Sequence, residues 1–278
     1  MRDLKQQIED KIVIKGPYSE KDLKAYSQKS LIKSLTCLDQ KLVTAQVAKG
    51  FSSLQAVHEL WIWSSVTRTA MREIIRIPEL QVLDLLEIIH PGRLMYFSEA
   101  IDLKEFRCNH YMSEADLIEI SKIPNLVELG AQGAEISQKS LEALLAMNKL
   151  KSLDLEGSEF DDKLAFIMAQ STQINRLEIG ASKITSNGFE LISNMSQLES
   201  LDIWATELRD IDMKCLTKLE NLKYLSIGGI AGQQHITYDG IIEILKDMPK
   251  LKRLWLDGVE LSDQQAGELH EKYEYFRN

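Results

Sequence analysis

The sequence has 278 residues, of which 44% are hydrophobic and 27% are charged, and its formal net charge is −9. These proportions are typical of a globular protein and argue against a disordered chain. No run approaches the roughly 18 apolar residues of a membrane-spanning helix. The acidic balance also disfavours general binding to the phosphates of nucleic acids.

The first residues and the cysteines bear on the cellular compartment. Residues 1–7 lack the apolar core of a signal peptide. Cys37, Cys108 and Cys215 are widely spaced and form no Cys-x-x-Cys pair, so neither a zinc ribbon nor a redox dithiol is predicted. We therefore expect a cytoplasmic protein in a reducing compartment.

Residues 1–31 are predicted to form an N-terminal cap. They contain a short apolar run at residues 12–14, a turn at Gly16 and Pro17, and a helix that Ser19 opens. Stacked repeats need such a cap because a terminal repeat otherwise exposes its apolar face.

From residue 32 to residue 261 one pattern recurs: apolar, two residues, apolar, one residue, apolar. Nine clear copies begin at Val57, Leu80, Leu103, Leu126, Leu150, Ile174, Leu198, Leu222 and Leu251, and a weaker copy begins at Ile32. The clear copies begin 23, 23, 23, 24, 24, 24, 24 and 29 residues apart. This regular spacing predicts about ten stacked repeats.

Each repeat is predicted to contain a strand, a turn and a helix. Alternating apolar residues favour a strand with one buried face, and helical apolar spacing follows it. Helix-capping residues precede the helices at Ser113, Ser137, Thr185, Thr237 and Ser262. Ser262 with Gln265, and Ser113 with Asp116, have the spacing of a capping box.

The last part of the chain holds two further features. The 29-residue interval adds a glycine-rich loop over residues 228–236, which is either a tolerated insertion or a lip that touches a partner. Residues 262–278 are predicted to form a charged C-terminal capping helix. No linker interrupts the pattern, so a single solenoid domain is expected.

The repeat resembles the leucine-rich repeat superfamily, whose signature is L-x-x-L-x-L with a period of 20–29 residues. The resemblance implies an α/β, right-handed solenoid (a horseshoe) with a parallel sheet on its concave face and helices on its convex face. The sequence departs from the family where an Asn or Cys is usual. It has Ser65, Ala134, Ser158, Ser182, Thr206 and Val259 there.

The strand register predicts which side chains point out of the sheet, away from the core. The outward positions hold all four tryptophans, nine acidic residues and three basic residues. Because exposed Trp and Tyr are typical interface anchors, we expect a partner-binding surface there. Its predicted residues are Glu59, Trp61, Trp63, Asp84, Glu105, Arg107, Glu128, Asp154, Glu156, Arg176, Glu178, Asp202, Trp204, Tyr224, Arg253, Trp255 and Asp257.

The sequence contains no motif that predicts catalysis. It has no phosphate-binding loop, no dinucleotide fingerprint, no H-E-x-x-H and no G-x-S-x-G. The five histidines are dispersed. The carboxylates of Asp154, Glu156, Glu178 and Asp202 could bind a cation or raise each other's pKa, but an acidic binding face explains them more simply. No catalytic residue, metal or cofactor is predicted.

These observations favour a non-enzymatic protein-binding module, monomeric when free, whose partner is a basic protein rather than a nucleic acid or a membrane. The most concrete version is an inhibitor or immunity protein that neutralises a cationic toxin or nuclease. The alternatives are an adaptor that recruits substrates to a larger complex, such as a ubiquitin ligase, and an enzyme. No docking module or catalytic domain is evident for either alternative.

Overall fold

The computed structural model describes residues 11–27, 32–54, 56–89, 94–229 and 235–277. The chain divides into two compact units, Met1–Ala131 and Gln132–Asn278. Both units are built in the same way, from parallel strands that alternate with helices or single helical turns. The sequence pattern predicts one continuous domain, and this stays a prediction.

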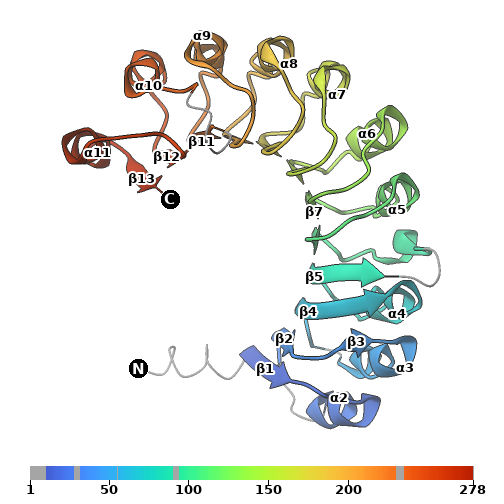
Figure 1. Ribbon diagram of the computed structural model, residues 1–278. Helices are drawn as coiled ribbons and strands as arrows, with labels where there is room; N and C mark the ends of the chain where they lie inside the picture. Colours follow the sequence, from blue (N-terminus) through green and yellow to red (C-terminus); the bar gives the residue numbers. More distant parts are fainter. Residues whose placement is uncertain (1–10, 28–31, 55, 90–93, 230–234, 278) are drawn as a thin grey trace. The chain divides into compact units, whose positions relative to one another are not determined.

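In the described residues of the first unit, six parallel strands follow one another in chain order. They are β1 (Lys11–Lys15), β2 (Ser34–Leu38), β4 (Glu59–Thr67), β5 (Val82–Ile89), β6 (Glu105–Cys108) and β7 (Glu128–Ala131), and the short β3 (Leu42–Val43) pairs with β4. Its helical segments are α2 (Glu20–Ser27), α3 (Ala45–Ala48), η1 (Phe51–Ser53), α4 (Arg68–Ile74), η2 (Phe97–Glu99) and α5 (Glu114–Ile120). These segments cover one face of the strands (Figure 1).

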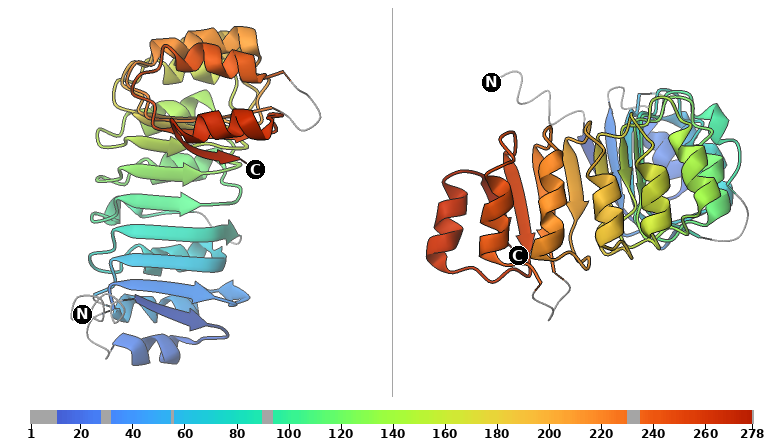
Figure 2. Two further views of the ribbon diagram at one scale, coloured as in Figure 1. Left: turned by 90° about the vertical axis from the view of Figure 1, so that its left-hand side faces the viewer. Right: turned by 90° about the horizontal axis from the view of Figure 1, so that it is seen from above.

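The second unit repeats this plan. Its parallel strands are β8 (Ser152–Asp154), β9 (Arg176–Glu178), β10 (Ser200–Ile203), β11 (Tyr224–Gly228), β12 (Arg253–Asp257) and β13 (Glu274–Arg277). Its helical segments are α6 (Gln138–Leu145), α7 (Asp162–Met168), α8 (Ser186–Ile192), α9 (Asp210–Met213), η3 (Lys214–Lys218), α10 (Tyr238–Leu245) and α11 (Asp263–His270). The successive helices pack side by side, as the view from above shows (Figure 2).

The core lies between the strands and the helices of each unit. The last two apolar positions of the repeat point into it: Leu83 and Leu85 in the first unit, and Leu153 and Leu155 in the second, are fully buried. Burying a side chain of this kind stabilises the fold by roughly 1.5–3 kcal/mol. The predicted inward register is therefore confirmed. Cys37 and Cys108 occupy inward positions and are buried as predicted.

The predicted helix starts are confirmed. Ser113 and Ser262 form capping boxes with Asp116 and Gln265. Thr185 also stands at a helix start, but its hydroxyl donates to Asp162 Oδ2 of the previous repeat at 2.6 Å. Thr185 therefore links two successive repeats through a hydrogen bond and also marks the start of the helix.

Two features differ from the predicted pattern, and one predicted feature lies outside the described residues. Helix α11 ends at His270, and β13 then pairs with β12, so the predicted capping helix is a helix followed by a strand. Within the described part of residues 80–102, the single turn η2 replaces the predicted helix. Residues 230–234 of the predicted lip lie outside the described residues. In the described chain every helix is too short or too polar to be a membrane span.

Candidate functional site

The helices leave the opposite face of the strands uncovered, and we call it the open face. Register places equivalent repeat positions side by side on this face. One row of the first unit is Val13, Thr36, Trp61, Asp84, Arg107 and Gly130. The equivalent row of the second unit is Asp154, Glu178, Asp202, Ser226 and Trp255.

The open face of the first unit carries exposed apolar side chains. Trp63 is 54% exposed and Val13 is 59% exposed, whereas Trp61 is half-buried. Strand β4 has one extra residue relative to β5 between Ile62 and Ser65, and Trp63 lies in this bulge. Bulges re-aim side chains, so Trp63 stands apart from the regular row of Trp61.

Asp84 differs from its predicted role. It is only 7% exposed, between Trp61 and Arg107 in register, so it does not present a free carboxylate to solvent. Burial raises the pKa of Asp84, and the positive charge of Arg107 partly opposes this rise in pKa. The prediction of an exposed Asp84 is wrong, and the large side chains of Trp61 and Arg107 are its neighbours on the two adjoining strands.

Arg107 remains exposed and interacts with the next strand. Its Nη2 donates to Glu128 Oε2 at 3.1 Å. Gly130 lies beneath the aliphatic part of Arg107, and a Cβ there would lie 3.0 Å from Arg107 Cγ. Glu59, Glu105 and Glu128 share a row on the same face and are half-buried.

In the second unit Trp204 packs onto backbone. A Cβ on Gly180 would lie 2.5 Å from Trp204 Cδ1 and 2.6 Å from its Nε1, so the indole lies directly over this glycine. The Glu156 carboxylate accepts a hydrogen bond from the Trp204 side chain, while burial and the nearby Asp154 raise the pKa of Glu156. Trp204 is therefore half-buried and contributes to packing as well as to the surface.

Asp202 is the most strongly perturbed carboxylate of the open face. Burial, with a smaller contribution from the charges of Glu156 and Asp154, raises the pKa of Asp202 to about 6. The backbone N–H of Trp204 donates to Asp202 Oδ1 at 3.1 Å, and Ser226 also hydrogen-bonds to it. This carboxylate consequently changes charge close to neutral pH.

A groove of about 590 Å³ crosses strands β9 to β13 near the ends at which the strands begin. It brings together predicted residues from separate repeats: Arg176, Glu178, Asp202, Tyr224 and Arg253. Trp255 and Asp257 lie farther along β12, where Asp257 closely approaches Gly228 on β11. The groove is thus lined by charges of both signs, not by an acidic surface alone.

The sequence reasoning missed the lysines of this groove. Lys223 and Lys252 line it, and each immediately follows the first leucine of its repeat. Only strand positions entered the predicted set, and these lysines lie one residue before the strands begin. The recurrence of Lys in this column, at Lys104 and Lys151 as well, could have revealed them.

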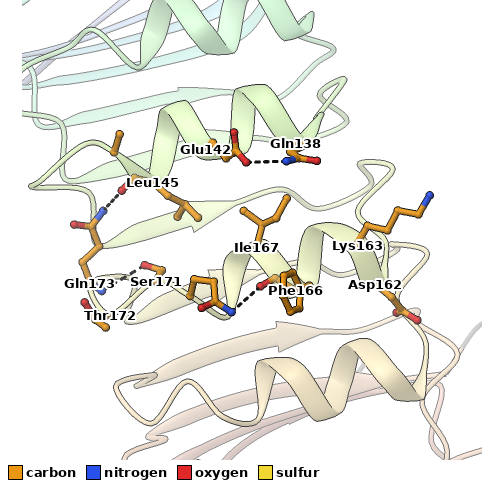
Figure 3. A pocket seen from close by; sticks show the side chains of 12 residues that line it. Gln138, Glu142, Leu145, Asp162, Lys163, Phe166, Ile167, Ser171, Thr172 and Gln173 are labelled. Atoms are coloured by element: carbon orange, nitrogen blue, oxygen red, sulfur yellow. Dashed lines mark hydrogen bonds between the residues drawn. The ribbon is translucent and has the colours of Figure 1, made fainter.

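A second cavity lies on the other side of the second unit. A cleft of about 990 Å³ opens between α6 and α7 (Figure 3). Phe166, 58% exposed, lies in it, and the side chain of Gln170 donates to the carbonyl of Phe166 at 3.3 Å. Gln173 spans the end of the cleft by donating to the carbonyl of Leu145 at 3.0 Å. None of the predicted site residues lines this cleft.

The described side chains do not suggest a metal centre. Across residues 11–27, 32–54, 56–89, 94–229 and 235–277, no three His, Cys, Asp or Glu side chains are grouped so that they could hold an ion. The thiols do not resemble nucleophiles, since burial raises the pKa of Cys108 and of Cys215 to about 11.

Equivalent positions of successive repeats therefore lie side by side on neighbouring strands. The chain has the leucine-rich-repeat fold. No family model matches the sequence, and no curated protein is significantly similar to it. Among solved structures it is similar to two internalins of Listeria monocytogenes. The structure of InlF is 17% identical in sequence and has a TM-score of 0.49. The match covers 97% of this chain and 87% of that chain. InlC2 has 16% identity, coverages of 94% and 84%, and a TM-score of 0.43. The fold assignment rests on the strand register.

Proposed function

We propose that this chain is a non-enzymatic protein-binding module whose open face captures a basic protein. The observation that carries the proposal is the exposure of large apolar side chains on the strands, Trp63 and Val13 above all. An exposed indole is unfavourable in water and becomes a strong anchor when a partner covers it.

The carboxylates of the open face support a basic partner. Glu59, Glu105 and Glu128 share one row of the first unit, and the second unit adds Asp154 and Glu178. Complementary charge accelerates association and disfavours partners of the same sign. A protein partner therefore fits this face better than a nucleic acid or an anionic membrane.

The finer proposal is an inhibitor or immunity protein that neutralises a cationic toxin or nuclease in the cytoplasm. A preorganised strand face can cover a basic active site without paying for its own ordering. The buried free thiols of Cys37 and Cys108 fit a reducing compartment. We expect the free protein to be a monomer and to turn over no substrate by itself.

Site-specific photo-crosslinking tests the proposal. A photoreactive phenylalanine analogue replaces Trp63 in one variant and Phe166 in a matched control, whose side chain is equally exposed but lies among the helices. We expect a specific protein adduct in native lysate only from position 63, identifiable by mass spectrometry. Equal labelling from both positions, or none from position 63, would contradict binding at the open face.

A functional assay tests the finer proposal. The captured protein is expected to be basic and to lose its nuclease or toxic activity when it is mixed with this chain at equal concentration. Trp63→Ala should weaken that inhibition, while Phe166→Ala should not. A captured protein that keeps full activity would point to an adaptor.

A further inference from the structure

The charges on the open face of the second unit are separated along the strand direction. Cations gather where the strands begin, and we call them the basic edge: Arg176, Lys223, Lys252 and Arg253. Carboxylates follow farther along, and we call them the acidic band: Asp154, Glu156, Glu178, Asp202 and Asp257.

Strand register places members of each group on neighbouring strands, although β10 adds no cation to the basic edge and β11 adds no carboxylate to the acidic band. Arg176 is aligned with Ser200 and Tyr224 with Arg253, while the N–H of Lys252 donates to the carbonyl of Lys223 at 2.9 Å. In the acidic band, Glu178 lies between its neighbours Asp154 and Asp202. Because all strands are parallel, every strand has the same polarity.

Part of the basic edge is neutralised within the chain. Lys223 pairs with Glu199 at 2.8 Å and Arg253 pairs with Glu274 at 2.5 Å. Arg176 and Lys252 are exposed and form no ion pair with any residue in the described part of the chain. These two cations, on either side of Tyr224 in the groove, therefore keep charge available for a ligand.

The distance between the basic edge and the acidic band differs from strand to strand. Arg253 precedes Asp257 by four residues on β12, which corresponds to roughly 13 Å at the rise of a β-strand, and Arg176 precedes Glu178 by two residues on β9, which corresponds to roughly 7 Å. The Debye length at physiological ionic strength is about 8 Å. On β12 a ligand charge at one group is thus largely screened from the other group, whereas on β9 the charges of the two groups act together.

We propose that this face binds a dipolar protein surface, with carboxylates set against the basic edge and lysine or arginine side chains set against the acidic band. The inference rests on the proposed function and adds the orientation of the partner. A partner rotated by 180° on this face would set its carboxylates against the acidic band and its basic side chains against the basic edge, which is strongly unfavourable. The charge pattern therefore favours one of the two opposite orientations of the partner along the strands.

Two peptides of identical composition test the polarity. The block peptide is acetyl-Glu-Glu-Gly-Gly-Arg-Arg-amide, and its isomer is acetyl-Glu-Arg-Gly-Gly-Glu-Arg-amide. Each spans about 20 Å when extended. Fluorescein-labelled forms are titrated with the full chain at low salt and followed by anisotropy. We expect the block peptide to bind about tenfold more tightly than its isomer.

Charge-reversal variants locate the effect. Arg176→Glu with Lys252→Glu should abolish the preference for the block peptide, and Lys139→Glu with Lys163→Glu, on exposed helix positions, should preserve it. Equal affinities for the two peptides, no binding of the block peptide, or a preference that survives the first double variant would each overturn the inference. The crosslink from position 63 does not depend on these peptides, so the two proposals can fail separately.

Discussion

Asp84 in the first unit and Asp202 in the second occupy the same repeat position, between two buried apolar residues of a strand. Their surroundings nevertheless differ. Asp84 lies between Trp61 and Arg107, whose charge opposes the rise in its pKa. Asp202 lies next to Glu178, and further carboxylates add to the rise in its pKa. The environment of an outward side chain is therefore determined by the adjoining strands rather than by its own repeat.

The surroundings of Trp63 and Trp204 also differ because of the adjoining strands. Trp63 projects from a bulge and is more than half exposed. Trp204 lies on Gly180 and shares a hydrogen bond with Glu156. The first indole is mainly a contact surface for a partner, and the second also supports the fold.

Removing a buried ring from the first unit and an exposed ring from the second should have the most unequal effects. Phe106 is fully buried, with its ring centroid 5.7 Å from that of Phe97. We expect Phe106→Ala to lower the free energy of unfolding by about 3–5 kcal/mol. Phe166→Ala should change it by less than about 0.5 kcal/mol. Urea denaturation measures both, and similar losses would refute the assigned core.

The next largest effect should follow from adding a methyl group under Trp204. Gly180→Ala forces the indole away from the strand, and we expect a loss of about 1–3 kcal/mol together with a red-shifted tryptophan emission. Gly267→Ala is the matched control, because a Cβ there meets nothing within 4 Å. In a helix this control should be neutral or stabilising. An unchanged emission in Gly180→Ala would show that Trp204 does not lie over the glycine.

A smaller effect should depend on pH. The folded-state pKa of Asp202 is about 6, above its ordinary value of 3.8, so the folded protein binds the extra proton in this interval. Its burial therefore reduces stability as pH rises through that window. We expect Asp202→Asn to stabilise the protein by about 1 kcal/mol at pH 7.5 and by nothing near pH 3.5. Thermal unfolding at both pH values measures this, and a gain that did not vary with pH would contradict it.

The smallest effect on stability is expected at Trp63. Because its side chain is largely exposed, Trp63→Ala should change the free energy of unfolding by less than about 0.5 kcal/mol. Trp204→Ala should lower it by roughly 1–2 kcal/mol, since contacts and a hydrogen bond are lost. Chemical denaturation of the two variants side by side decides the matter. Equal losses would remove the distinction between the two indoles.

Much of the fold could be predicted because each element depends on nearby residues. The spacing of apolar residues identified Leu83 and Leu85 as core, and a capping residue at Ser113 marked the start of a helix. The sequence does not predict the C-terminal strand β13, because the charged residues of 262–278 indicate a helix throughout. The sequence also predicts a helix before Leu103, where the structure has only the single turn η2, whose residues show no distinct apolar period.

The candidate site was predicted only in part. The alternation rule placed Arg176, Glu178 and Asp202 on one face, and the groove confirms that they lie together. The same rule could not foresee that Asp84 is buried or that Lys223 and Lys252 extend the surface. Exposure and charge pairing depend on residues some 24 positions away in the sequence, which local patterns do not weigh.

The sequence by itself determined the repeat length, the inward and outward sides of each strand and the starts of the capped helices, because these follow from periodicity and local hydrogen bonds. Only the tertiary structure decided which outward side chains become neighbours. It placed the indole of Trp204 over Gly180, placed Trp63 in a bulge, and brought Lys223 and Lys252 into one groove with Glu178 and Asp202. The physical reason is that parallel register joins residues a full repeat apart, and their packing and charges act only once the strands are side by side.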